Sequence, residues 1–125
     1  MILDINGLSA IADGDPNLEP VLRTAPELVI PVIVVGEYRY GISQSRRRRR
    51  YEEWLKLLLA NCRVLWVDET TAAEYAAIRT ELRRSGKSIP ANDAWIAALA
   101  RQHTLPVISR NEHFDLVPKL TRVGW

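Results

Sequence analysis

Short apolar runs alternate with segments of helical periodicity along the whole chain. The apolar runs, rich in β-branched and aliphatic residues, cover residues 1–3, 28–35, 64–67 and 105–108. Parallel strands are joined by helical crossovers that cover both faces of the sheet. This alternation therefore predicts an α/β fold, with a central, mostly parallel sheet between two layers of helices.

Three of the intervening segments are predicted to be helical. Residues 71–82 begin with a Thr-Ala-Ala-Glu pattern that is typical of a capping box, and Gly86 is expected to end this helix. A later helix is expected to have Asn92 as its N-cap, which places Asp93 in the first turn. Residues 51–60 also have helical spacing.

Residues 32–42 fit two interpretations. The four β-branched residues 32–35 favour a strand. Val34, Glu37 and Gly41 would, however, share one face of a helix. Residue propensity alone leaves both interpretations open.

Length and composition restrict the class of protein. The chain has 125 residues, 47% of them hydrophobic, so we expect residues 1–125 to form a single domain. No apolar stretch approaches the roughly 18 residues of a membrane span, and the first residues lack the pattern of a secretory signal. These features predict a cytoplasmic protein that does not contact a membrane.

Cysteine and histidine are too few for a Cys/His zinc site or an intrachain disulfide. Cys62 is the single cysteine, and the two histidines both lie late in the chain. Lys and Arg number 17 against 15 Asp and Glu, and only three of the 17 are lysines. The run Arg46–Arg50 fits either a solvated surface or a contact with phosphates.

Three carboxylates lie in or beside segments that the pattern predicts to be buried. Asp4 follows the first apolar run, Glu37 lies in the ambiguous segment, and Asp93 opens the late helix. Separately, each has an ordinary explanation, such as a helix cap, a solvated helix acid or a first-turn acid. An unpaired buried carboxylate costs several kcal/mol, so together they indicate a shared cation. Oxygen ligands suit Mg²⁺ or Mn²⁺.

Four motifs in order resemble those of PIN-domain ribonucleases, and most closely those of the VapC-type toxins. They are ILDIN at residues 2–6, VGEYRYGI at 35–42, IPANDAWIAA at 89–98 and ISRNEHF at 108–114. The resemblance extends over essentially the whole chain. It implies a three-layer α/β/α PIN-like domain in which Glu37 lies on a helix and the preceding strand ends near Pro31.

The resemblance also implies a function and a set of metal ligands. The expected function is that of the toxin of a toxin-antitoxin pair, a Mg²⁺- or Mn²⁺-dependent endoribonuclease. Such toxins are usually dimeric, and a cognate antitoxin inhibits them by covering the acidic pocket. Asp4, Glu37 and Asp93 match the catalytic and metal-holding acids of the family, and Asn111 occupies the position of a further acid, as an auxiliary ligand.

The chain departs from the family pattern at two positions. Asn111 carries no charge, so Glu112 or Asp115 would have to compensate from nearby. Ile5 replaces the usual Thr or Ser, while Asn6 keeps the next position polar and is expected to orient a ligand or a water. These departures leave open a catalytically weak or inactive PIN-like binding module.

Two further expectations concern chemistry and class. Hydrolysis by a metal-activated water would leave 5′-phosphate and 3′-hydroxyl ends on RNA. A receiver-type phosphoacceptor domain has similar size, but the middle of this chain carries the run Arg46–Arg50 where such a domain needs an aspartate.

His113, beside Phe114, is expected to be packed rather than catalytic.

Overall fold

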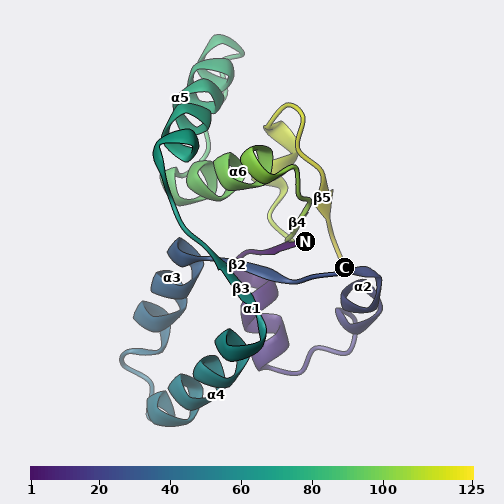
Figure 1. Ribbon diagram of the computed structural model, residues 1–125, viewed down its shortest axis with the longest axis vertical. Coiled ribbons are helices and arrows are strands. Elements are labelled where there is room, and N and C mark those ends of the chain that lie inside the picture. Colours follow the sequence, from purple (N-terminus) through teal and green to yellow (C-terminus); the bar gives the residue numbers. More distant parts are fainter.

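The computed structural model describes residues 1–125 and has a five-stranded parallel sheet at its centre (Figure 1). The strands are β1 (Ile2–Leu3), β2 (Val29–Pro31), β3 (Arg63–Leu65), β4 (Val107–Ile108) and β5 (Arg122–Val123), in the order β3-β2-β1-β4-β5. All four pairings are parallel, which confirms the predicted sheet. The sequence pattern missed β5, because Arg122 and Val123 lie outside any apolar run.

Helices cover both faces of the sheet. They are α1 (Ile5–Ala12), α2 (Glu19–Thr24), α3 (Val32–Ile42), α4 (Arg48–Asn61), α5 (Glu69–Arg84) and α6 (Ala91–His103), followed by a 3₁₀ helix, η1 (Glu112–Leu116). From β1 the chain adds β2 and then β3 on one side of β1. After β3 it crosses back, and β4 and β5 lie on the other side of β1. Since such crossovers are right-handed, α5 and α6 lie on the face opposite α1–α4, as Figure 1 shows. None of these helices is both long and apolar enough to cross a membrane.

The ambiguous segment is a helix. β2 ends at Pro31, whose extended backbone (φ −60°, ψ 139°) serves as the N-cap, and α3 begins at the next residue. Val34, Tyr38 and Ile42 are buried at intervals of four residues, which is the spacing of one helical face. The strand end inferred from the family resemblance is confirmed, and burial of this face outweighs the β-propensity of the valines.

The helix ends differ from the predicted caps. The capping box of α5 starts at Asp68, whose Oδ1 accepts a bond from the Thr71 amide at 3.0 Å, so the prediction of Thr71 as N-cap was wrong by three residues. The N-cap of α6 is the backbone of Pro90, and Asn92 is already inside the helix. Gly86 follows the end of α5 with φ +69°, as predicted.

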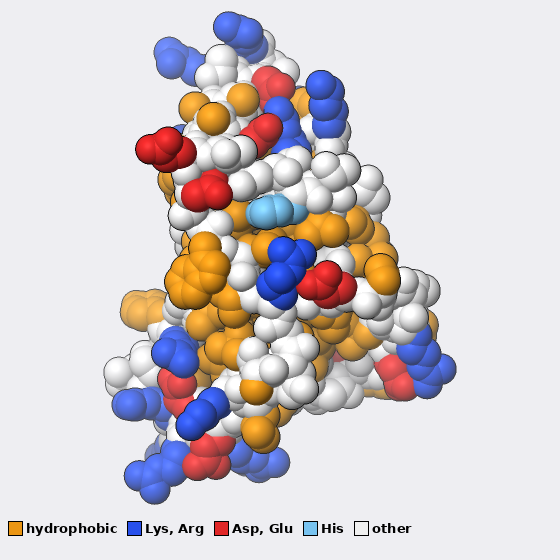
Figure 2. Space-filling view, in the orientation of Figure 1, with side chains coloured by type: hydrophobic (Ala, Val, Ile, Leu, Met, Phe, Trp, Pro, Cys, Tyr) orange, Lys and Arg blue, Asp and Glu red, His pale blue; other side chains and the backbone are white.

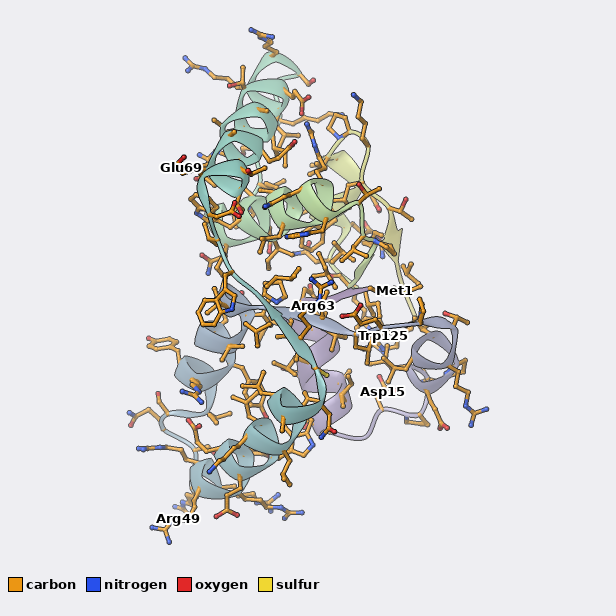
Figure 3. All side chains as sticks on the ribbon, in the orientation of Figure 1. Met1, Asp15, Arg49, Arg63, Glu69 and Trp125 are labelled. Atoms are coloured by element: carbon orange, nitrogen blue, oxygen red, sulfur yellow. The ribbon has the colours of Figure 1, made fainter.

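The C-terminus is held against the loop that follows α1. Trp125 Nε1 donates to Asp15 Oδ2 at 3.1 Å, and Figure 3 shows the two residues side by side. Arg110 pairs with the same carboxylate oxygen at 2.9 Å, and its guanidinium lies 4.6 Å from the centroid of the Trp125 ring. These contacts fix the segment that follows β4, where several polar side chains gather.

Helix α1 packs very closely on the sheet at Gly7. A β-carbon at this position would lie 2.9 Å from Leu3 Cδ2 and 3.3 Å from the carbonyl oxygen of Ile108. The first of these groups belongs to β1 and the second to β4. Only glycine therefore lets α1 lie this near both strands.

Gly7→Ala should destabilise the fold by about 1–3 kcal/mol, because the backbone of β4 cannot move away cheaply. Gly36→Ala is the matched control: this helical glycine on α3 is exposed and has nothing within 4 Å of a β-carbon. That change should stabilise the protein by up to about 1 kcal/mol through helix propensity. Urea unfolding measures both, and effects of the same sign would contradict the close packing of α1.

Candidate functional site

Polar side chains gather at the carboxyl end of the sheet, where the strand order reverses. β1 and β4 are neighbours with Leu3 opposite Ile108, so the residues that follow them, Asp4 and Ser109, lie beside each other. Ligand sites of open parallel sheets occur at such reversals. The sheet register thus joins two residues that are 105 positions apart.

Asp4 is the most buried acid of the chain, with 2% of its surface exposed. Its Oδ1 accepts a bond from the Gly7 amide at 3.0 Å and caps α1, and its Oδ2 accepts a bond from the Ser109 hydroxyl. Burial raises the pKa of Asp4, as does the charge of Asp93, while the bonds from Ser109 and Gly7 act in the opposite direction. The cap explanation is therefore confirmed for this residue, which also lies among the polar side chains at the end of β1.

A chain of hydrogen bonds runs from Asp4 to Asp93 through two residues that follow β4. The Ser109 hydroxyl donates to Asp4 and accepts a bond from the backbone amide of Asn111, with a distance of 2.8 Å between the Asn111 nitrogen and the Ser109 oxygen. Asn111 Nδ2 donates to Asp93 Oδ2 at 3.0 Å. Sequence reasoning missed Ser109, although its place directly after an apolar strand was the available signal.

Asn111, the expected auxiliary ligand, makes hydrogen bonds through both ends of its side-chain amide. While Nδ2 bonds to Asp93, Oδ1 accepts from the backbone amide of His113 at 2.9 Å. Both ends of the side-chain amide are therefore engaged within the protein. In this arrangement Asn111 orients Asp93 through a bond that a carboxylate at position 111 could not make.

His113 lies in the site, contrary to the expectation that it is packed. Its Nδ1 is 3.1 Å from Asp93 Oδ2, and 47% of the His113 side chain is exposed. Phe114 is fully buried, and the turn of η1 directs the preceding side chain outward toward α6. The contacts of Asn111 and His113 both use Oδ2 of Asp93, so Oδ1 of that carboxylate is not involved in either.

Glu37 presents an unpaired oxygen. Its Oε1 is buried and has no hydrogen-bond partner, which is unusual for a polar atom in a folded protein. Burial is the main reason that the pKa of Glu37 is raised; the charges of Asp93 and Asp4 raise it further, and the Asn92 side chain partly offsets them. The three acids are therefore near enough to influence one another.

The donor set suits a hard divalent cation, because carboxylate oxygens are the ligands that Mg²⁺ and Mn²⁺ prefer. However, no three Asp, Glu, His or Cys side chains lie close enough in this structure to hold one ion together. Mg²⁺ commonly keeps several of its waters, so bridging waters or a small movement of side chains would complete such a site.

The other polar candidates have other roles or lie at the rim. Asn6 is exposed, and its Oδ1 lies 3.5 Å from the Ser109 hydroxyl. Asp115 pairs with Arg122 through two bonds of 2.9 and 2.8 Å, which lower the pKa of Asp115. Asp115 is therefore engaged by Arg122, and Glu112 is exposed on η1.

The parallel sheet and the acidic pocket at its point of reversal define an α/β protein with a carboxylate site suited to a cation. The chain belongs to the PIN domain family, whose model matches residues 1–120. This finding confirms the resemblance that the four sequence motifs indicated.

Named relatives come from bacteria. The toxin FitB of Neisseria gonorrhoeae is 34% identical, over 89% of this chain and 87% of that protein. Ribonuclease VapC5 of Mycobacterium tuberculosis is 32% identical, over 74% of each chain. Among solved structures, VapBC2 from Rickettsia felis, bound to a DNA fragment from its promoter, matches with a TM-score of 0.86 at 26% identity, covering 99% of this chain and 97% of that one.

The raised pKa of Glu37 predicts how stability depends on pH without divalent metal. The folded state keeps this proton above the ordinary pKa of 4.5, where the unfolded chain has lost it. The free energy of unfolding should therefore fall as the pH rises from about that value through the raised pKa. Glu37→Gln should flatten this fall and be more stable than the wild type at neutral pH.

Urea unfolding in a chelating buffer at several pH values measures this difference. Glu53→Gln, at an exposed glutamate of α4, is the control and should keep the wild-type slope. Identical slopes for the wild type and Glu37→Gln would show that burial of this carboxyl has no energetic effect.

Asn111→Asp distinguishes a bridging amide from a ligand. If the amide orients Asp93, the new carboxylate loses its donor and places two like charges about 3 Å apart. Without metal, the variant should then lose about 1–3 kcal/mol of stability. Unchanged unfolding in chelator, together with tighter Mn²⁺ binding by calorimetry, would instead identify residue 111 as a ligand position.

Proposed function

We propose that this protein is a metal-dependent endoribonuclease that acts as the toxin of a toxin-antitoxin pair. The observation that carries the proposal is the buried, unpartnered Oε1 of Glu37, within reach of the charges of Asp4 and Asp93. A carboxylate oxygen in this state needs a cation or a proton. A relative that is called a ribonuclease and another that is called a toxin support this assignment.

Asp4, Glu37 and Asp93 would hold Mg²⁺ or Mn²⁺, directly or through water. When bound, the ion would lower the pKa of a water molecule and offset the charge that develops on the phosphoryl group. The protein supplies the orientation: α1 and Ser109 fix Asp4, while Asn111 and His113 fix one oxygen of Asp93.

Glu37 is the best candidate for the proton acceptor in this site. Its Oε1 has no hydrogen-bond partner within the protein, so it is free to accept a proton from a water that the ion would orient. Asn6, at the rim beside Ser109, would orient a ligand or the attacking water. Since water attacks, the ribose 2′-hydroxyl is not needed as a nucleophile.

The proposed partners follow from the same family. A cognate antitoxin would cover the acidic site; in support, a structural relative, VapBC-5 from Mycobacterium tuberculosis, is described as a member of the VapBC family of toxin-antitoxin systems. A homodimer would cover exposed aromatic surface, because Tyr40 and Trp66 are 83% and 69% exposed. With RNA as its substrate, the protein would act in the cytoplasm.

A PIN-like binding module with weak or no activity is the second candidate. It is favoured by two features: no three acids are close enough to form a preformed metal cage, and residue 111 has an amide instead of an acid. Such a module would bind RNA or its partner protein without hydrolysis.

Cleavage assays separate the two candidates. With Mn²⁺ or Mg²⁺ the wild type should cut single-stranded RNA and leave 5′-phosphate and 3′-hydroxyl ends, and a chelator should stop the reaction. Glu37→Gln should lower kcat by about 10²–10⁴-fold, because it removes the proton acceptor, whereas the control Glu53→Gln should cut normally.

Two results would contradict the proposed mechanism. Products that end in a 2′,3′-cyclic phosphate would show that the ribose hydroxyl attacks. No cleavage of any RNA with either metal, by protein that still binds RNA, would identify the binding module.

A further inference from the structure

The N-terminal end of α4 carries five consecutive cations without partners. Arg46–Arg50 are all exposed, and none of them takes part in an ion pair, although six other arginines do. The N-cap position of α4 is itself an arginine, Arg47, and it has no side-chain cap. Cations at this end of a helix oppose its dipole and repel one another. This arrangement is unfavourable for the isolated protein, and an anion would relieve it.

A groove leads from Glu37 toward the start of α4, where hollows lined by these arginines adjoin it. It has a volume of about 340 Å³, and its walls include Glu37 and Gly41 of α3, Ile5 of α1 and Tyr51 of α4. Glu37 and Gly41 are separated by about one helical turn, or roughly 5.4 Å along the axis. The groove therefore begins at one of the proposed catalytic acids and extends along α3.

Arginines flank the far end of this groove on two sides. One adjoining hollow shares Tyr51 with the groove and is lined by Arg47 and Arg50. A second shares Ser45 with the groove and is lined by Arg48 and Arg49. Figure 3 shows Arg49 at the outer end of α4, directed into solvent. A strand in the groove would thus leave it between two pairs of guanidinium groups.

We propose that Arg46–Arg50 bind the phosphates of a single RNA strand that lies in this groove, with its scissile phosphate at the acidic pocket. The proposal deepens the proposed function and rests on it. The acidic pocket repels phosphates, so the affinity for a polyanion has to come from another part of the surface, and these free cations lie at the end of the path. Guanidinium groups bind phosphate oxygens through two parallel hydrogen bonds.

The lining favours RNA over a protein partner. The hollow at Arg48 and Arg49 has no hydrophobic residue in its wall, and the hollow at Arg47 and Arg50 adds the rings of Tyr51 and Trp54, on which bases can stack. The groove itself is half apolar and includes the ring of Tyr51, which suits riboses and stacked bases. Phosphates would lie at the arginines, and bases would lie in the groove.

The chain offers a matched control at the opposite end of the molecule. Arg79, Arg83 and Lys87 line another hollow, at the end of α5, and Arg84 is exposed beside them. Figure 1 places α5 and α4 at opposite ends of the long axis, and Figure 2 shows cationic side chains at both ends. Replacing four cations at either end changes the net charge equally.

The test measures binding of a fluorescent, unstructured 20-nucleotide RNA by anisotropy over a series of KCl concentrations. EDTA is present, so binding is measured without cleavage. One variant carries Arg47→Gln, Arg48→Gln, Arg49→Gln and Arg50→Gln; the control carries Arg79→Gln, Arg83→Gln, Arg84→Gln and Lys87→Gln. Thermal melting checks the fold of both, and the first should melt at the wild-type temperature or above.

The groove variant should bind at least about ten-fold more weakly at low salt, and its slope of log K against log salt should become shallower by about 0.7 for each phosphate that the protein no longer neutralises. The control should keep the wild-type slope. Equal decreases in RNA affinity for both variants would show that only the net charge of the protein matters. Unchanged RNA affinity of the groove variant would show that RNA does not bind at this surface. Either result overturns the proposal.

Two further measurements separate this proposal from the proposed function. If the groove variant keeps its RNA affinity while the wild type cuts RNA with Mn²⁺, the nuclease assignment stands and the proposed phosphate contacts of Arg46–Arg50 are wrong. If the groove variant keeps RNA affinity but no longer binds poly-L-glutamate, the arginines serve an acidic protein partner. If the wild type does not bind RNA at all, the proposal is also overturned.

Discussion

The hydrogen bond between Asp4 and Ser109 is the contact on which the site depends. It joins the ends of the two central strands, β1 and β4, and therefore exists only when the sheet has its full parallel register. Asp4 accepts a second bond from the start of α1, so a single buried carboxylate ties together one helix and two strands. Leaving this charge buried without those donors would cost more than the marginal stability of a small domain allows.

From this contact the order of the site extends outward. Ser109 holds the backbone of Asn111, and Asn111 in turn holds Asp93 at the start of α6. Arg110, between them, is fixed by Asp15 and Trp125, so the C-terminus supports the same segment. The carboxylates are thus positioned by a connected network, while Glu37, on α3, approaches them from the other side with one oxygen unpaired.

Two unfavourable concentrations of charge lie near one groove, with Glu37 in its wall and the arginines in the hollows that adjoin it. Burial and neighbouring acids raise the pKa of Asp4 and of Glu37, and five free arginines lie at the start of α4. Each is costly for the isolated protein, and each would be relieved by a ligand of opposite charge, a cation for the acids and phosphates for the arginines. A nuclease needs both, because the acids alone would repel the RNA backbone. The charge distribution and the proposed chemistry therefore support each other.

The sequence by itself determined the class of fold and the family. Apolar runs of strand length alternating with helical segments predicted the parallel sheet, and the motifs around Asp4, Glu37 and Asp93 predicted the family, because both signals are local in the chain. Local signals erred where neighbouring residues compete for one role, as at the N-caps Asp68 and Pro90.

Only the tertiary structure decided how the site is assembled. Strand register placed Ser109 beside Asp4, the bonding of both ends of its amide gave Asn111 its bridging role, and the turn of η1 brought His113 to Asp93. These contacts join residues far apart in the chain, so no local pattern encodes them. The folded sheet alone brings the donors and acceptors within bonding distance.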